Sequence, residues 1–222
     1  GLTVEYNKEL GKNLQLCELE EKYDAIFLAF GANITTKMNV EGENLKGVYG
    51  GNQLLEKGNH PDYKNRKVAI IGGGNVAIDC ARTIKRMGPS EVNIIYRRSQ
   101  EEMPAEEKEI EEAKQEGIKF LFQNNITKII GNEKVEKIEL IKTQLVQKDN
   151  EIRKVPIDIE GSNYIIDMDY VIMALGSRPD DITKTLKLDT DEKGYIKIND
   201  ENMTSREKVF AGGDLAKCKG TV

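Results

Sequence analysis

The sequence predicts an α/β protein built around a mostly parallel sheet, and three observations support this. A short, largely β-branched strand at Lys67–Ile71 runs directly into three glycines. An amphipathic stretch with helical periodicity follows at Asn75–Met87 and ends at Gly88-Pro89. A second buried strand comes next, at Val92–Tyr96. Strand, helix and strand in this order form a βαβ unit, whose strands lie parallel.

A second helix and a third strand extend this unit. The acidic stretch that opens near Pro104 and closes at Gly117 is predicted to be a helix with Ile110 and Ala113 on its inward face. An apolar strand at Ile118–Phe122 follows it. The order along the chain is therefore βαβαβ.

After this unit the sequence predicts a β insertion and a closing strand. Gly131-Asn132 has turn composition and is predicted to join strands at Thr127–Ile130 and Val135–Leu140 as a hairpin. The apolar run Tyr170–Leu175 is predicted to be the buried strand that closes the domain.

Two strands that flank the central unit share a pattern. Tyr23–Ala32 and Asp169–Gly176 each break from a buried strand into a glycine-containing turn, which suggests two related subdomains. The polar stretch Lys57–Arg66 has loop composition and is interpreted as the linker where the central domain starts. The predicted organisation is a first segment at 1–62, a central domain at 63–176 and a second flanking segment at 177–222.

Composition excludes several classes of function. The net charge is −5, with 38% apolar and 32% charged residues, so we expect neither a nucleic-acid nor a membrane partner. The three cysteines, Cys17, Cys80 and Cys218, are far apart in sequence, and His60 is the single histidine. We therefore expect no redox pair of neighbouring cysteines, no metal site and a reducing, cytoplasmic setting.

The glycine-rich turn predicts dinucleotide binding. Its sequence fits the pattern GxGxxA directly after a strand and directly before a helix. Such glycines permit a tight turn and a close approach of the backbone to a pyrophosphate, and the small final residue lets the helix pack near the sheet. The residues predicted to hold the cofactor here are Gly72, Gly73, Gly74, Asn75, Val76 and Ala77.

The end of the next strand indicates which dinucleotide is bound. NAD-binding versions of this unit carry an acidic residue there, which accepts hydrogen bonds from the ribose hydroxyls. In this sequence the strand ends instead in Arg97 and Arg98, with no carboxylate at that point. Two guanidinium groups suit a 2′-phosphate, so NADP(H) is favoured over NAD(H).

Each of these features also has a plainer interpretation. The glycines could form a purely structural turn, and the arginines could merely solvate a strand end. The acidic run Glu106–Glu116 is interpreted as a solvated helix face rather than a carboxylate site, and Cys80 as a packing residue.

Three segments taken together resemble the small (beta) subunit of NADPH-dependent glutamate synthase and related FAD/NAD(P)-dependent pyridine nucleotide oxidoreductases. They are Gly72–Arg82, Tyr96–Ser99 and Glu102–Ala105. The resemblance extends over nearly the whole chain, because the strand ends at Ala29–Gly31 and Ala174–Gly176 and the segment Val209–Asp214 follow in the order of that family.

The resemblance implies an α/β fold in which a Rossmann-like NAD(P)-binding domain, three-layered with a parallel sheet and a β insertion, is inserted between segments of a truncated FAD-binding domain. It further implies that Gly176, with Asn75 and Val76, contacts the pyrophosphate or the nicotinamide side, and that Gly213 and Asp214 contact the flavin. Iron–sulfur clusters would be held by an amino-terminal region that this sequence lacks.

By the same resemblance, the parent protein is expected to pass hydride from NADPH to FAD, with the glutamate synthase large subunit as its partner. No acid, base or nucleophile is nominated, since the cofactors carry the chemistry. The chain reads as a piece of a longer protein and is expected to be inactive alone. A subunit of an NADPH:ferredoxin-type oxidoreductase, or a non-catalytic NADP-binding module, is the alternative.

Overall fold

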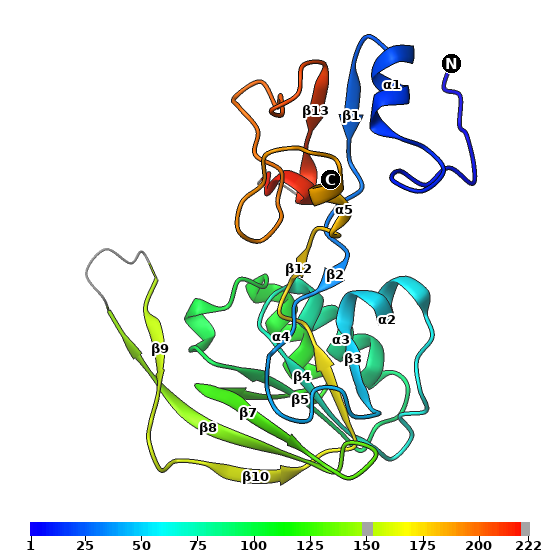
Figure 1. Cartoon of the computed structure of the whole chain (residues 1–222). Helices are drawn as coiled ribbons and strands as arrows, with labels where there is room; N and C mark the ends of the chain where they lie inside the picture. The colour runs from blue at the N-terminus through cyan, green and yellow to red at the C-terminus, as the bar shows by residue number, and fades with distance from the viewer. Residues whose placement is uncertain (148–152, 219–222) are drawn as a thin grey trace. The chain divides into compact units, whose positions relative to one another are not determined.

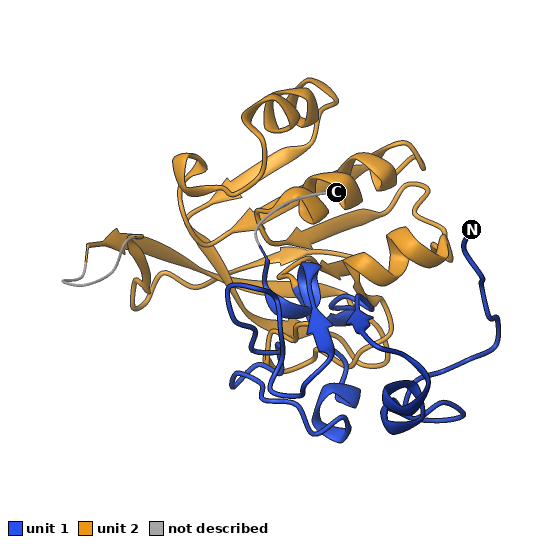
Figure 2. Ribbon diagram, turned by 90° about the horizontal axis from the view of Figure 1, so that it is seen from above, with its two compact units in different colours: residues 1–34, 177–222 blue, residues 35–176 orange. Residues whose placement is uncertain are grey.

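The structure, a computed structural model, describes residues 1–147 and 153–218. The chain divides into two compact units, which are coloured separately in Figure 2. Unit 1 comprises Gly1–Ile34 and Ser177–Val222, and unit 2 comprises Thr35–Gly176. Unit 2 is therefore inserted in sequence between the two segments of unit 1.

Unit 2 is built on a parallel sheet of five strands. In spatial order these are β3 (Val48–Gly50), β11 (Tyr170–Met173), β4 (Lys67–Ile71), β5 (Glu91–Tyr96) and β6 (Lys119–Phe122). From β4 the chain moves outward through β5 and β6, and it later returns to β11 on the other side of β4 (Figure 1). The strand order thus reverses beside β4, and such a switch point is where parallel α/β sheets bind ligands.

Helices cover one face of this sheet. They are α2 (Gly51–Lys57), α3 (Asn75–Lys85) and α4 (Glu107–Gln115), and a short 3-10 turn, η1 (Gln100–Glu102), precedes α4. Because side chains alternate along a strand, Val68 and Ile70 of β4 join the core beneath the helices. In α3, the residues of the predicted inward face are all at most 1% exposed: Ala77, Cys80, Ala81 and Ile84.

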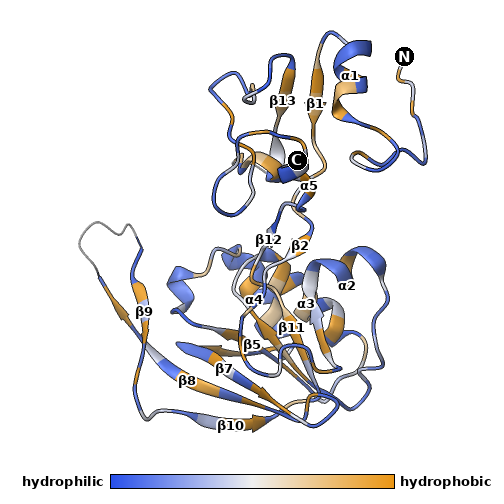
Figure 3. Ribbon diagram, in the orientation of Figure 1, coloured by the Kyte–Doolittle hydropathy of each residue, from blue (hydrophilic) through white to orange (hydrophobic). Residues whose placement is uncertain are grey.

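The opposite face of the sheet is covered by an antiparallel insertion. Its strands are β7 (Asn124–Ile130), β8 (Lys137–Val146), β9 (Val155–Asp158) and β10 (Tyr164–Asp167). Ala69 and Ile71 of β4 form a second core with its apolar side chains. The apolar character of the central strands is visible in Figure 3. The structure therefore confirms the predicted three layers, with the β insertion as the third.

Unit 1 has a smaller core around a parallel pair of strands. Strands β1 (Ile26–Leu28) and β13 (Val209–Ala211) pair directly, and Ile26, Leu28, Val209 and Ala211 are buried. The remaining elements are α1 (Leu16–Lys22), β12 (Ser177–Arg178), α5 (Ile182–Thr185) and the 3-10 turn η2 (Gly213–Ala216). The two-residue strand β2 (Ile34–Thr35) spans the point in the sequence where unit 1 ends and unit 2 begins.

The first boundary between the units differs from the predicted one. Compact unit 2 starts at Thr35, not at residue 63, because β3 pairs with β11 and α2 packs against α3. The polar stretch Lys57–Arg66 is a connection inside unit 2 that leads from α2 to β4. The second boundary falls between Gly176 and Ser177, as in the predicted division.

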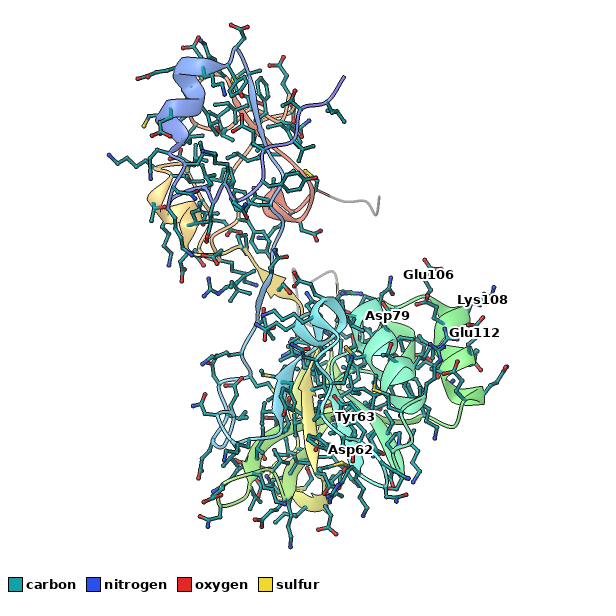
Figure 4. The ribbon with its side chains drawn as sticks, turned by 90° about the vertical axis from the view of Figure 1, so that its right-hand side faces the viewer. Asp62, Tyr63, Asp79, Glu106, Lys108 and Glu112 are labelled. Atoms are coloured by element: carbon teal, nitrogen blue, oxygen red, sulfur yellow. The ribbon has the colours of Figure 1, made fainter. Side chains whose placement is uncertain are left out.

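Helix α4 is shorter than predicted. It begins at Glu107 rather than near Pro104, because the segment before it is extended and bonds to the glycine turn. Its Ile110 and Ala113 are buried, whereas Glu106 and Lys108 are exposed on the outward side (Figure 4). The acidic run is thus a solvated helix face, as interpreted from its spacing.

Arg82 ties α3 to α4. Its guanidinium lies 3.0 Å from a carboxylate oxygen of Glu112 and 2.8 Å from one of Glu116. The hydrogen bond from Arg82 lowers the pKa of Glu116. The charged residues at this contact are therefore paired with one another beside the apolar core.

Burial of Cys80 predicts a loss of stability in alkali. Desolvation raises the pKa of this thiol to about 12 from an ordinary value of 9.0. Above pH 9 the thiol stays protonated in the folded chain but ionises on unfolding. The contribution of Cys80 to the free energy of unfolding therefore falls by about 1.4 kcal/mol per pH unit above pH 9. Below pH 9 this contribution is fully present.

The measurement is urea unfolding between pH 8 and pH 11, on the wild type and on Cys80→Ala. The fall in unfolding free energy should be smaller in the variant, since it lacks the thiol. The matched control is Cys17→Ala, which removes an exposed thiol. Its free energy of unfolding should decrease with pH as steeply as that of the wild type. Equal slopes for wild type and Cys80→Ala would contradict the prediction.

Candidate nucleotide-binding site

The predicted unit 2 residues gather at the carboxyl ends of three neighbouring strands. Gly72 directly follows β4, and its N–H donates to the carbonyl of Ile95 in β5 at 3.0 Å. Arg97 and Arg98 directly follow β5, so they lie beside the glycine turn. Gly176 follows β11 on the other side of β4. These positions surround the switch point of the sheet.

The first two glycines are required by close contacts. Gly72 has a φ of +142°, and a Cβ there would lie 2.2 Å from the carbonyl oxygen of Ala174. A Cβ on Gly73 would lie 2.6 Å from the ring of Tyr96. The Ala174 carbonyl is part of the main chain, and the Tyr96 ring is held through its hydroxyl, so a side chain at either position would clash and glycine lets the turn lie against the ends of β11 and β5.

Gly74 is different, because the space beside it is open. A Cβ there would meet nothing nearer than Pro104 Cγ, at 3.8 Å. The backbone N–H groups of residues 73–76 have no acceptor within the described part of the chain. Ala77 is fully buried, and its N–H donates to the carbonyl of Gly74 at 2.9 Å. Free amides at the start of an 11-residue helix, beside a glycine without steric neighbours, fit a pyrophosphate.

The segment between η1 and α4 packs beside the glycine turn and is hydrogen-bonded to it. Tyr96 donates its hydroxyl hydrogen to the carbonyl of Glu102 at 2.8 Å. Ala105 donates its N–H to the carbonyl of Gly73 at 3.2 Å, and Met103 and Ala105 are buried. In the sequence analysis these residues support the family resemblance, but no contact with the glycine turn is predicted for them. Their role here is to hold the turn and the end of β5 in one rigid arrangement.

The two arginines have different surroundings. Arg97 is exposed, and its guanidinium has no hydrogen-bond or ion-pair partner among residues 1–147 and 153–218. The side chain of Arg98 is 19% exposed, and its Nε donates to the carbonyl of Lys154 at 3.1 Å and lies 4.0 Å from the Glu102 carboxylate. Arg97 is therefore free to take an anionic ligand, whereas Arg98 is already anchored through Nε.

The residues predicted for the flavin lie in unit 1. Gly213 has a φ of +63° and starts η2, and both it and Asp214 are exposed. The N–H of Gly212 donates to the carbonyl of Leu28 at 3.3 Å, which attaches this turn to β1. Gly213 and Asp214 thus follow β13 as the glycine turn follows β4, and their contact with a flavin remains a prediction.

The described residues contain neither a metal-ligand cluster nor a membrane-spanning helix. No group of three or more histidine, cysteine or acidic side chains could hold a metal ion there. Likewise, no helix in that part of the chain is both long and apolar enough to cross a bilayer.

A glycine turn with free amides at the switch point of a parallel sheet defines a dinucleotide-binding α/β protein. The family model of the pyridine nucleotide-disulphide oxidoreductases matches residues 4–222. The chain therefore belongs to this family, whose members use FAD and a pyridine nucleotide.

Curated relatives support the resemblance to glutamate synthase small subunits. The chain is 34% identical to the glutamate synthase [NADPH] small chain of Halomonas elongata, over 94% of this chain and 48% of that protein. It is 36% identical to the NADPH-Fe(3+) oxidoreductase subunit beta of Geobacter sulfurreducens, over 96% of this chain and 36% of that protein. The chain thus spans about half or less of the length of these relatives.

Solved structures agree on the fold. The chain is similar to FprA of Mycobacterium tuberculosis in complex with NADPH, with a TM-score of 0.83 and 22% identity. That comparison covers 97% of this chain and 63% of FprA. At this identity the likeness establishes the fold alone.

Proposed function

We propose that unit 2 binds NADPH and that the parent protein uses it as an electron donor. The observation that carries this proposal is the row of amides at residues 73–76 beside the guanidinium of Arg97, none of which has a partner within the described part of the chain. Amides at a helix start suit the pyrophosphate, and the adjacent guanidinium suits the 2′-phosphate that distinguishes NADPH from NADH. The similarity to proteins named for NADPH supports the same choice.

In this proposal Gly72 and Gly73 shape the turn, Gly74 with Asn75 and Val76 presents amides to the pyrophosphate, and Ala77 packs the helix against the sheet. Arg97 and Arg98 bind the 2′-phosphate, and Gly176 lines the neighbouring strand end. Gly213 and Asp214 serve the flavin in unit 1. When bound, the cofactors supply hydride transfer from NADPH to FAD, while the protein sets orientation and selectivity.

Calorimetric titration of the chain with NADPH and with NADH tests cofactor choice. NADPH should bind at least about tenfold more tightly, because each charge-assisted hydrogen bond to the extra phosphate contributes roughly 1.5–3 kcal/mol. Comparable affinity for both dinucleotides would remove the phosphate-binding role of the arginines.

For the parent protein, we propose the small subunit of NADPH-dependent glutamate synthase, with its large subunit as partner. A second candidate is an NADPH-oxidising subunit that reduces ferredoxin or ferric iron, which is favoured by the 36% identity to the Geobacter protein. Expression of the complete gene with an affinity tag separates them. Co-purification of a glutamate synthase large subunit, with glutamate formed from glutamine and 2-oxoglutarate, supports the first, and NADPH-driven reduction of ferredoxin or ferric iron without it supports the second.

A protein that binds NADP without turning it over is the third possibility. The same tagged protein discriminates this case by dye reduction with NADPH. Turnover of the dye identifies an enzyme, whereas tight NADPH binding by a flavin-loaded protein without turnover identifies a binding module.

A further inference from the structure

The β insertion fixes the main chain of the arginine pair. Beyond the end of β5, the carbonyl of Arg97 accepts a hydrogen bond from the hydroxyl of Thr143 at 2.7 Å. The carbonyl of Arg98 accepts from the N–H of Gln123 at 3.0 Å. Thr143 lies in β8, and Gln123 lies between β6 and β7. Both anchors therefore come from the segment that follows the central βαβαβ unit.

Thr143 is held in this position by burial and by hydrogen bonds to Gln123. The residue is 3% exposed, and it is one of four buried polar residues in the described part of the chain. Its N–H donates to the carbonyl of Gln123 at 2.8 Å, and Gln123 Nε2 donates to the carbonyl of Thr143 at 3.3 Å. Gln123 has a left-handed φ of +52°, and its own N–H donates to the carbonyl of Arg98. Thr143 and Gln123 are therefore hydrogen-bonded to each other as well as to the main chain of the arginines.

The same insertion also holds one arginine side chain. Arg98 Nε donates to the carbonyl of Lys154, directly before β9, which pairs with β8. Nothing within the described residues bonds to the terminal nitrogens of Arg98. A guanidinium attached in this way offers its remaining N–H groups in a fixed direction.

We propose that Thr143 is a positioning residue for cofactor selectivity, acting through Arg97 on the 2′-phosphate of NADPH; this rests on the proposed function. The carbonyl of Arg97 belongs to the planar peptide that joins Arg97 to Arg98. Fixing that plane fixes the positions of both Cα atoms, the points from which the two side chains leave the main chain. The β insertion is then part of the selectivity apparatus, not only a cover for the sheet.

The test replaces Thr143 with valine, which has nearly the same shape but no hydroxyl. The Arg97 carbonyl loses its donor, so the affinity for NADPH should fall by about tenfold, as expected when one hydrogen bond that holds the binding geometry is lost. The affinity for NADH should stay within about twofold, because NADH has no 2′-phosphate to place. Thr143→Ser, which keeps the hydroxyl, should restore selectivity.

Thr127→Val is the matched control. Thr127 lies in β7 of the same insertion and bonds to Glu139, at 2.6 Å to the carboxylate, with no bond to either arginine. Both dissociation constants are measured by calorimetry for every variant, together with the urea midpoint.

Unchanged NADPH affinity in Thr143→Val would overturn the inference, as would an equal loss for NADH, which indicates a general disturbance. A wild type that binds both dinucleotides equally would overturn the proposed function and, with it, this inference. If the wild type prefers NADPH over NADH and Thr143→Val shows the same preference, only the role of Thr143 is overturned.

Discussion

Replacing Gly72 with alanine should destabilise the protein by about 3 kcal/mol or more, which places it among the most damaging single substitutions. The position has a φ of +142°, where a side chain is strained whatever the space around it. In addition, the new Cβ would lie 2.2 Å from the carbonyl oxygen of Ala174, at the end of β11. Relief requires β4 and β11 to move apart, which disrupts the centre of the sheet. Urea unfolding measures the loss directly.

Gly74→Ala is the same substitution two residues later, but it should leave the stability nearly unchanged and weaken NADPH binding instead. Gly74 has φ −92° and ψ 179°, which alanine adopts readily, and its nearest neighbour would be Pro104 at 3.8 Å. We expect the unfolding free energy to stay within about 1 kcal/mol of the wild type, as for other substitutions without a steric or polar cost. NADPH binding should fall strongly, since the methyl group occupies the approach of the pyrophosphate. A stable Gly72→Ala protein, or full NADPH affinity in Gly74→Ala, would contradict this description of the turn.

Replacing Arg97 with alanine should lower the affinity for NADPH between about 10-fold and 100-fold, the range for losing charge-assisted hydrogen bonds to a phosphate. Affinity for NADH should change little. Because Arg97 is exposed and its side chain makes no bond to a described residue, stability should be unaffected. Calorimetric titration with each dinucleotide gives both values.

Arg86→Ala is the control for the loss of one positive charge. Arg86 caps the carboxyl end of α3, at the opposite end of the helix from the glycine turn, and its side chain is 65% exposed. It should leave both affinities unchanged apart from a small effect of net charge, which added salt screens. If Arg97→Ala and Arg86→Ala weaken NADPH binding equally, the effect of Arg97 is not specific.

The features that the sequence predicted well are local ones. The strand at Lys67–Ile71, the glycine turn and the start of α3 at Asn75 follow from residues that are adjacent in sequence, and the structure has them at these positions. The same local pattern predicts that Arg97 and Arg98 lie beside the turn, because β4 and β5 belong to one βαβ unit and pair in parallel.

Features that depend on distant pairing were not predicted. The start of unit 2 at Thr35 depends on β3 pairing with β11, more than a hundred residues later in the chain. Thr143 bonds to Arg97 across 46 residues, and nothing in the sequence around either residue signals that contact. The anchoring of Arg98 on Lys154 is of the same kind, so the different surroundings of the two arginines became visible only in three dimensions.

An NMR titration of the chain observes each contact directly. The backbone amide signals of residues 73–76 should shift with both NADPH and NADH, because both carry the pyrophosphate. The side-chain Nε–H signals of Arg97 and Arg98 should shift with NADPH and with 2′,5′-ADP, but not with NADH. Arginine signals that respond equally to NADH, or amides at 73–76 that respond to neither dinucleotide, would contradict the proposed NADPH site.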